Sequence, residues 1–339
     1  MFCLGIESTA HTFACSVVQY SFYQNRLIGK ILSDARDIYV PPTGSGIHPR
    51  DASRHHCKAV ETVFKHALCS AKVSMRDIDV IAYSAGPGLG PCLRVGAVVA
   101  RTLSAFHSKP LVPTNHGIGH VELGIMISRA KDPLVLLVSG GHTAILAFSG
   151  KRWRIFGETL DITLGQLFDQ FGRSLGLPSP CGHEIEQLGR KAAGNYRLLP
   201  YVVKGNDVSF SGLLTSAIRS VHNKSKELSL GEISFSLQET SFAMVTEAVE
   251  RALSLTLKNE FLIVGGVAAN NRLAEMLKEA CKRQKCKFYR CPAELAGDNG
   301  AQIAWAGILE YVGKGRHVQV EKAFINQSWR INDVEVIRN

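Results

Sequence analysis

Two hairpin patterns, one opening each half of the chain, constrain the fold most. In the first, apolar residues 2–6 and 13–18 flank the turn Glu7-Ser8-Thr9-Ala10-His11-Thr12. In the second, apolar residues 134–138 and 144–148 flank the turn Ser139-Gly140-Gly141-His142-Thr143. Short apolar runs on either side of a polar turn are typical of paired, buried strands. Their recurrence in a chain of 339 residues predicts two similar lobes.

The remaining pattern alternates helices and strands. Helical periodicity is found over residues 51–71, 94–107, 232–258 and 270–283, and buried strands are expected at 78–83 and 261–264. This alternation predicts an α/β fold with mixed sheets. The pair Gly265-Gly266 joins a strand to a helix, where the absence of side chains lets a ligand approach the helix N-terminus. We expect a first lobe over 1–130, a second over 131–315, and a tail over 316–339 that can return to the first lobe.

Charge and composition narrow the classes of partner. No apolar run is long enough to span a membrane, and the N-terminus lacks a secretory pattern, so we expect a cytoplasmic protein, or a nuclear one in a eukaryote. Nine scattered cysteines without a CxxC spacing do not indicate a disulfide framework. A net charge of +10 favours nucleic acid as partner. The densest basic segment fits phosphate contacts or a solvated helix face equally well: Lys278, Lys282, Arg283, Lys285, Lys287 and Arg290.

Three residues form a candidate metal site. His116 and His120 are four apart, so a helix over 115–127 would place both imidazoles on one face, at the spacing that grips one metal ion. Asp298, just before an expected helix over 301–311, is the candidate anionic ligand, although it could equally be an N-cap. A zinc peptidase would need a glutamate directly after the first histidine, and position 117 is glycine.

Two glycine-rich turns could hold an anion through backbone N–H groups. They are Ser139-Gly140-Gly141 and Gly86-Pro87-Gly88-Leu89-Gly90. Neither matches the Walker or the dinucleotide-binding pattern, and each is also compatible with an ordinary turn.

Eight short motifs occur in an order that resembles a known family. They are Gly5-Ile6-Glu7-Ser8-Thr9-Ala10-His11-Thr12, Gly86-Pro87-Gly88-Leu89-Gly90, Asn115-His116-Gly117-Ile118-Gly119-His120-Val121-Glu122, Val138-Ser139-Gly140-Gly141, Gly157-Glu158-Thr159-Leu160-Asp161, Phe210-Ser211-Gly212-Leu213, Gly265-Gly266-Val267-Ala268-Ala269-Asn270-Asn271-Arg272 and Asp298-Asn299-Gly300. Together they resemble the catalytic subunit of the universal tRNA threonylcarbamoyladenosine synthesis family, formerly described as O-sialoglycoprotein endopeptidase-like. Further segments resemble its archaeal and eukaryotic branch, which works inside the KEOPS complex.

The resemblance implies a fold, a reaction and a set of site residues. The fold would be the actin-like, Hsp70-like (ASKHA) two-lobed fold with duplicated mixed-sheet domains. The reaction would move a threonylcarbamoyl group from threonylcarbamoyl-AMP to the N6 amine of the adenosine 3′ of the anticodon in ANN-decoding tRNAs. His116, His120 and Asp298 would be catalytic and hold one divalent metal (Fe, Zn or Mg). The residues implied for threonylcarbamoyl-AMP, ATP or AMP are Leu137, Val138, Ser139, Gly140, Gly141, Asp169, Gly182, Glu186 and Asn270.

The resemblance also implies partners and shows departures. The partners would be tRNA, a separate small kinase or ATPase, a dimerising subunit, and functionally the threonylcarbamoyl-AMP synthase. Leu137 stands where the archaeal and eukaryotic branch has a metal-side tyrosine, and His142 stands where it has asparagine. Cys181-Gly182-His183 departs from the family's adenosine loop. A metallopeptidase and a non-catalytic ATP-binding switch subunit are the alternatives.

Overall fold

The computed structural model describes residues 1–24, 26–222 and 229–338. Its first sheet has the strand order β3-β2-β1-β5-β6, with β4 also paired to β2. The strands are β1 (Phe2–Glu7), β2 (Thr12–Tyr23), β3 (Arg26–Ile31), β4 (Ala35–Ile38), β5 (Val80–Gly86) and β6 (Leu111–Asn115). β1 and β2 form the predicted antiparallel hairpin, and β1, β5 and β6 run parallel.

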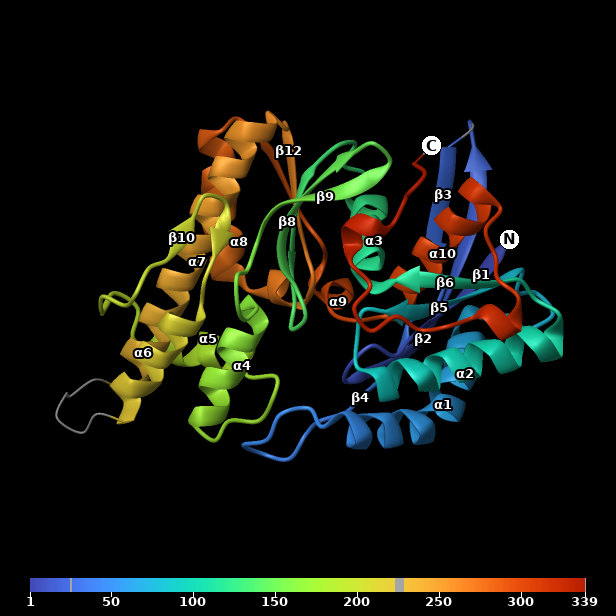
Figure 1. Ribbon diagram of the computed structural model, residues 1–339, viewed down its shortest axis with the longest axis horizontal. Coiled ribbons are helices and arrows are strands. Elements are labelled where there is room, and N and C mark those ends of the chain that lie inside the picture. Colours follow the sequence, from blue (N-terminus) through green and yellow to red (C-terminus); the bar gives the residue numbers. More distant parts are fainter. Residues whose placement is uncertain (25, 223–228, 339) are drawn as a thin grey trace.

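The second sheet repeats this topology in the order β9-β8-β7-β12-β13. Its strands are β7 (Leu134–Val138), β8 (Thr143–Ser149), β9 (Arg152–Glu158), β12 (Glu260–Val264) and β13 (Lys287–Arg290). β7, β8 and β9 are antiparallel neighbours, whereas β7, β12 and β13 run parallel, as their counterparts do in the first sheet. The prediction of two lobes built by duplication, each opened by a hairpin, is therefore confirmed. Figure 1 shows the lobes side by side, with α3 and α9 between them.

Helices pack on both the outer and the inner faces of the two sheets. The longer ones are α1 (Pro49–Ala71), α2 (Gly90–His107), α3 (His116–Ser128), α4 (Leu164–Ser174), α5 (Gly182–Lys191), α6 (Ser211–His222), α7 (Leu230–Thr256), α8 (Asn271–Arg283) and α10 (Gly300–Lys314). The shorter elements are α9 (Ala293–Ala296), the 3₁₀ turns η1 (Gly266–Ala269), η2 (Val320–Lys322) and η3 (Ile331–Asp333), and the strand pair β10 (Val203–Lys204) and β11 (Asp207–Val208).

The glycine-rich segment over residues 86–90 forms a short connection between β5 and α2. β5 continues to Gly86 and α2 begins at Gly90, so three residues connect them. Pro91 occupies the first turn of α2, where the missing N–H of proline is tolerated. Proline in this position therefore starts the helix and does not extend the loop.

Alternating side chains divide the interior into an inner and two outer cores. In the first sheet, Leu4 and Ile6 face α1 and α2, whereas Cys3 belongs to the inner core with α3 and α10. In the second sheet, Leu136 faces α4 and α7, while Leu137 faces α3. α3 thus lies between the two sheets and contributes to the core that they share.

Helix α10 packs on the first sheet, although it follows the second sheet in sequence. Gly5 of β1 and Gly300 of α10 make this approach possible, because a Cβ on either would overlap backbone atoms of the facing element. The expected boundary at residue 315 follows chain order, whereas packing places α10 beside β1 and β5. We propose that α10 be counted with the first lobe.

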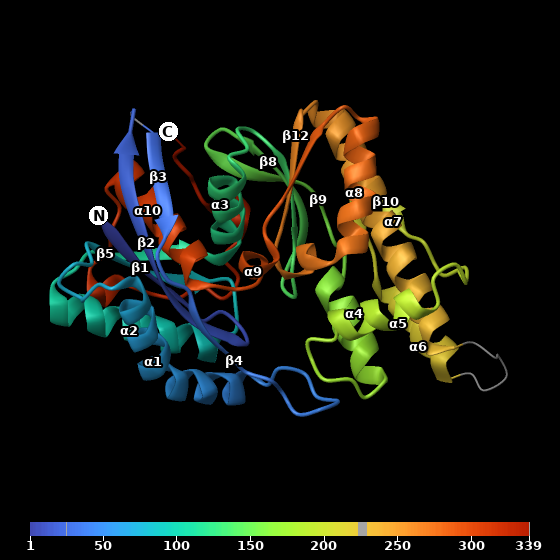
Figure 2. The ribbon, with the colours of Figure 1, turned by 180° about the vertical axis from the view of Figure 1, so that it is seen from behind.

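The C-terminal segment contacts both lobes. Its Val318 bridges to Leu111 of β6, and its Asn326 N–H donates to the Ala85 carbonyl. Further along, Glu335 bridges to Arg152 of β9. In Figure 2, seen from behind, the chain between β4 and α1 also extends toward α4, where Gly46 lies close to Arg173.

Candidate active site

Helix α3 places His116 and His120 on one face, as the spacing predicted. Asn115 caps the helix by accepting a hydrogen bond from the Ile118 N–H. The two imidazole centroids are 4.7 Å apart and their planes are nearly perpendicular. Asp298 Oδ1 lies 3.2 Å from His120 Nε2 and 3.5 Å from His116 Nε2. One ligand atom from each of the three residues lies within 4.8 Å of the other two.

Asp298 is free to face the histidines because its neighbour caps the helix. The side chain of Asn299 accepts the Gln302 N–H at 2.8 Å, and is the N-cap of α10. The alternative that Asp298 serves as the cap is therefore wrong. Asn299 is fully buried, and its amide is held by backbone carbonyls of the preceding turn.

A buried carboxylate orients the first histidine. Glu7, at the end of β1, has no exposed surface, and its Oε2 lies 2.9 Å from His116 Nδ1. Gln302 and Thr9 also approach Nδ1, at 3.1 Å and 3.3 Å. Because Nδ1 is engaged by this group, Nε2 is the nitrogen that faces Asp298. A carboxylate behind a ligating imidazole is a common arrangement in metal sites, where it fixes the tautomer and the ring orientation.

Burial and charge set the protonation of this cluster. Burial disfavours a charge on His116, but the carboxylates of Glu7 and Asp298 outweigh it and raise its pKa to about 9. For His120, burial prevails and lowers the pKa. Burial opposes ionisation of Asp298, yet His116 and His120 hold its pKa well below its usual range. In the metal-free cluster Asp298 is therefore ionised and His116 is protonated on both ring nitrogens, and a metal would displace the proton on Nε2.

The donor set fits a divalent metal. Two imidazole nitrogens and one carboxylate are typical of catalytic sites, where three protein ligands leave positions open for substrate or water. His116 and His120 are almost fully buried, and Asp298 is slightly exposed. The cluster is thus buried on the histidine side, and solvent or a ligand can approach it beside Asp298.

The turn between β7 and β8 is held in shape by Ser139. Its hydroxyl accepts the N–H groups of Gly141 and His142, at 3.2 Å and 3.0 Å. Thr163, the N-cap of α4, donates its hydroxyl hydrogen to the Gly140 carbonyl. Cβ atoms built on Gly140 and Gly141 would meet almost nothing, so their backbone faces open space beside the N-terminus of α4. This arrangement suits an anion.

The remaining predicted nucleotide residues lie on the second lobe. Asn270 caps α8, and its amide donates to Gln238, which in turn donates to the Ile185 carbonyl of α5. Asp169 of α4 accepts the Cys181 N–H at the start of α5. α4, α5, α7 and the cap of α8 are thereby joined through hydrogen bonds.

Comparison with known proteins identifies the family. A model of the tRNA N6-adenosine threonylcarbamoyltransferases (TsaD) matches residues 28–305. The chain belongs to this family. A relative of that name from Caldivirga maquilingensis is 44% identical over 337 residues, which span 99% of this chain and 98% of the relative. One from Metallosphaera sedula is 46% identical, with 99% of both chains covered.

Two further matches are a longer relative and a solved structure with a similar fold. A Methanocaldococcus jannaschii protein named a probable bifunctional tRNA threonylcarbamoyladenosine biosynthesis protein is 46% identical, and the match covers 99% of this chain and 60% of that one. The crystal structure of HypF from T. kodakarensis matches with a TM-score of 0.62 at 12% identity, over 92% of this chain and 48% of that chain. At such identity the likeness shows the fold alone, and it supports the predicted two-lobed ASKHA architecture.

The residues predicted to bind the nucleotide in this transferase differ from one another in burial and in contacts. Leu137 and Val138 are fully buried in separate cores, so they can offer a ligand only their backbone. Glu186 is paired with Arg190 at 2.7 Å. A Cβ on Gly182 would meet nothing within 4 Å. Among the described residues, no hydrogen bond or ion pair links Glu186 to Asn270.

Sequence reasoning missed three supporting residues. Glu7 and Gln302 hold His116, and Gln238 holds Asn270. A glutamate directly after an apolar strand was a signal for Glu7, since buried carboxylates need a partner. Gln302 lies in the first turn of α10, three residues after the N-cap Asn299, but nothing local distinguishes it from other helix residues.

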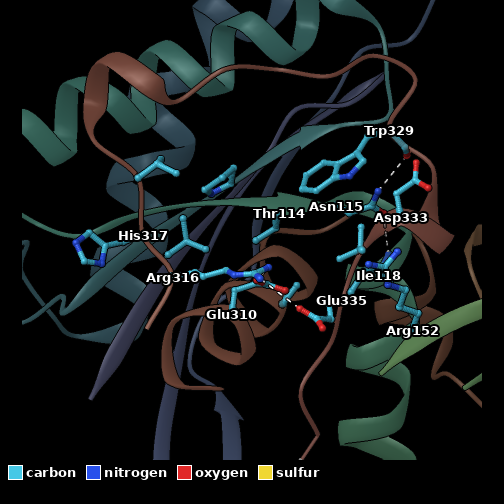
Figure 3. Close-up of a pocket in the computed structure, with 15 residues that line it drawn as sticks. Thr114, Asn115, Ile118, Arg152, Glu310, Arg316, His317, Trp329, Asp333 and Glu335 are labelled. Carbon is cyan, nitrogen blue, oxygen red and sulfur yellow. Dashed lines mark hydrogen bonds and ion pairs between the residues drawn. The ribbon is translucent and has the colours of Figure 1, made fainter. Parts of the chain in front are cut away.

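A separate cavity of about 350 Å³ lies behind the N-terminus of α3 (Figure 3). The C-terminal segment forms one wall, and Asn115 donates to the Trp329 carbonyl across it. Arg316 at its rim pairs with Glu335 at 3.2 Å. None of the three predicted metal ligands lines this cavity, so it is distinct from the metal site.

The basic segment is partly engaged within the protein. Arg283 pairs with Glu250, and Arg290 donates to the Ala268 carbonyl. Among the described residues, the cysteines at 281, 286 and 291 do not form a metal cluster.

None of the helices in the described ranges 1–24, 26–222 and 229–338 combines the length and apolar character needed to cross a bilayer.

Proposed function

We propose that the chain transfers a threonylcarbamoyl group from threonylcarbamoyl-AMP to N6 of the adenosine 3′ of the anticodon in ANN-decoding tRNAs. The observation that carries this proposal is the cluster of His116, His120 and Asp298, backed by Glu7, in a chain of this family. In the transfer, a bond forms between N6 and the carbamoyl carbon, and the bond from that carbon to the AMP phosphate breaks. N6 loses a proton, and AMP leaves with the electron pair.

A divalent metal on His116, His120 and Asp298 would supply Lewis-acid stabilisation of the negative charge that develops in this step. Glu7 keeps His116 in the tautomer that presents Nε2, so the ligands are arranged before substrate arrives. No nucleophilic serine or cysteine is required, because the substrate is already activated as an acyl phosphate.

The turn over 139–143 supports binding of the phosphate. Gly140 and Gly141 expose backbone beside the N-terminus of α4, where anions are favoured. Gly265 lies against the Val138 carbonyl, and a Cβ on Gly266 would meet nothing within 4 Å. We therefore place the phosphate at Ser139–Gly141, and the ribose and adenine toward Asp169, Gly182, Glu186 and Asn270.

The family also suggests how the chain is used. We propose that it acts as the catalytic subunit of a KEOPS-type assembly, with a separate small kinase or ATPase and a dimerising subunit. Threonylcarbamoyl-AMP would come from its synthase, and the place of action would be the cytoplasm, or also the nucleus in a eukaryote. The net charge of +10 supports attraction to tRNA, whereas partners would fix the position of the tRNA.

Reconstitution tests the proposal. The purified chain, its partner subunits, the synthase, tRNA, threonine, bicarbonate and ATP are combined, and the modified nucleoside is quantified by mass spectrometry. We expect modification with the wild type and with His222→Ala, which changes an exposed histidine at the end of α6. We expect almost none with His120→Ala or Asp298→Asn.

The outcomes separate the alternatives. Nucleotide binding without any modified nucleoside would indicate a non-catalytic switch subunit. Cleavage of a protein substrate that depends on His120 would indicate a metallopeptidase. Full activity in His120→Ala and Asp298→Asn would contradict the metal site and leave the transfer reaction standing.

A further inference from the structure

His142 is a histidine beside the metal cluster that the mechanism above does not use. It lies at the end of the β7–β8 turn, and its ring stacks on His116 with centroids 6.4 Å apart and planes 24° apart. Its backbone is fixed on both sides, because its carbonyl accepts the Ser139 N–H and its N–H donates to the Ser139 hydroxyl. The position of the ring is therefore set by the same turn that is proposed to hold the phosphate.

The side chain leaves one nitrogen without a partner. His142 Nδ1 is buried, and no protein group in the described part of the chain bonds to it. A buried polar atom without a partner is unfavourable, and in an active site it commonly marks the place of a ligand atom. Neither the core nor the turn needs a nitrogen there, since hydrocarbon would satisfy the stacking on His116.

The nitrogen is not placed as a fourth metal ligand. The group whose ligand atoms lie within 4.8 Å of one another contains His116, His120 and Asp298, but not His142. Its ring runs nearly parallel to that of His116, beside the cluster. A ligand atom bound between the metal ligands and the turn at Gly140 would therefore lie next to His142.

We propose that His142 is a substrate-contacting residue whose Nδ1–H donates a hydrogen bond to an oxygen of the threonylcarbamoyl group. This inference rests on the proposed function, because it places the acyl group between the metal ligands and the phosphate turn. It deepens that function by assigning recognition of the transferred group, as opposed to the nucleotide, to one side chain. The buried Nδ1 has no protein partner among the described residues, so its hydrogen-bonding capacity is left for the transferred group.

Two ligands and three variants test the assignment. The ligands are AMP and a non-reactive sulfamide analogue of threonylcarbamoyl-AMP, titrated calorimetrically into the full chain loaded with metal. His142→Phe keeps a stacking ring without nitrogen, and His142→Asn keeps an amide near the position of Nδ1. His222→Phe changes an exposed histidine on α6 and serves as the matched control. Metal content and thermal unfolding are measured for every protein.

We expect His142→Phe to bind the analogue about tenfold more weakly than wild type while its affinity for AMP changes by less than about twofold, the size of one lost hydrogen bond. His142→Asn should recover most of the lost affinity, and metal content should not change. If His142→Phe does not fold, His142→Ala gives the same comparison.

Three outcomes would overturn the assignment. Equal losses for AMP and the analogue would place His142 at the nucleotide, and no loss for either would remove it from the site. Loss of metal from His142→Phe and His142→Ala would make it a ligand. A wild type that binds the analogue no better than AMP would instead contradict the proposed function itself.

Discussion

Glu7 on the first strand and His116 on the third helix, 109 positions apart in the chain, are joined at 2.9 Å between Oε2 and Nδ1. Both residues are buried: Glu7 has no exposed surface and His116 is 6% exposed. The pair ties the first hairpin to the helix that carries both histidines. It also explains why a glutamate ends an otherwise apolar strand.

Removing the charge of Glu7 should weaken metal binding. In Glu7→Gln the amide can still contact Nδ1, but it no longer favours the tautomer and orientation that present Nε2. We expect the metal affinity to fall by about 10- to 100-fold, measured by competition with a chelator. Asp37→Asn is the control, because Asp37 contacts His55 at 3.0 Å on the surface. Equal metal retention in Glu7→Gln and wild type would contradict the role of Glu7.

Metal affinity should increase with pH. The pKa of His116 is raised from 6.5 to about 9, so below that pH the metal must displace a proton. Affinity should rise by about tenfold per pH unit from about pH 7 and level off above about pH 9. The contacts of protonated His116 with the two carboxylates also stabilise the metal-free fold. This contribution to the free energy of unfolding is complete below pH 6.5 and is lost as the pH rises through about 9. A flat affinity profile over this range would mean that His116 is neutral before metal binds.

Bulk at Gly266 should prevent nucleotide binding without unfolding the protein. A Cβ at this position meets no protein atom within 4 Å, so valine is sterically tolerated by the fold. It would project into the space assigned to the nucleotide. We expect Gly266→Val to keep its melting temperature within a few degrees, about the size of a surface substitution, and to lose measurable AMP binding. Gly212→Val, also in open space but on α6, should bind AMP normally.

The C-terminal arginine should stabilise the helix that bears the histidines. Arg338 contacts the buried Glu122 of α3 at 3.0 Å and stacks on Phe148 and Trp153, whose indole N–H also donates to Glu122. Arg338→Ala leaves this carboxylate without its cation, so we expect a loss of about 3 kcal/mol in the free energy of unfolding.

Urea denaturation with two further variants checks that expectation. In the Arg338→Ala, Glu122→Gln double variant the loss should be smaller, because no buried charge remains. Arg330→Ala breaks an exposed pair with Glu158 and should cost less than about 1 kcal/mol. If Arg338→Ala and Arg330→Ala lower the free energy of unfolding equally, the buried Arg338–Glu122 contact stabilises the protein no more than an exposed ion pair does.

Much of the fold was readable from local patterns. The hairpins at the start of each half, the helix that carries His116 and His120, and the strand before Gly265 all have the periodicity or turn residues of the element they form. The duplication followed from comparing two such patterns. The segment over 159–222 gave no comparable prediction. Its helices α4, α5 and α6 have only 11, 10 and 12 residues, and α5 and α6 bury two and three of them.

The sequence by itself determined the two hairpins, the longer helices, the family and the spacing of the two histidines, because these depend on neighbours within a few residues. Only the tertiary structure decided which distant groups meet them. Asn299 takes the cap of α10, which leaves Asp298 for the histidines. Gly5 and Gly300 let α10 pack on the first sheet, which brings Gln302 to His116. Such contacts depend on how closely two surfaces approach, and short-range sequence patterns do not specify that distance.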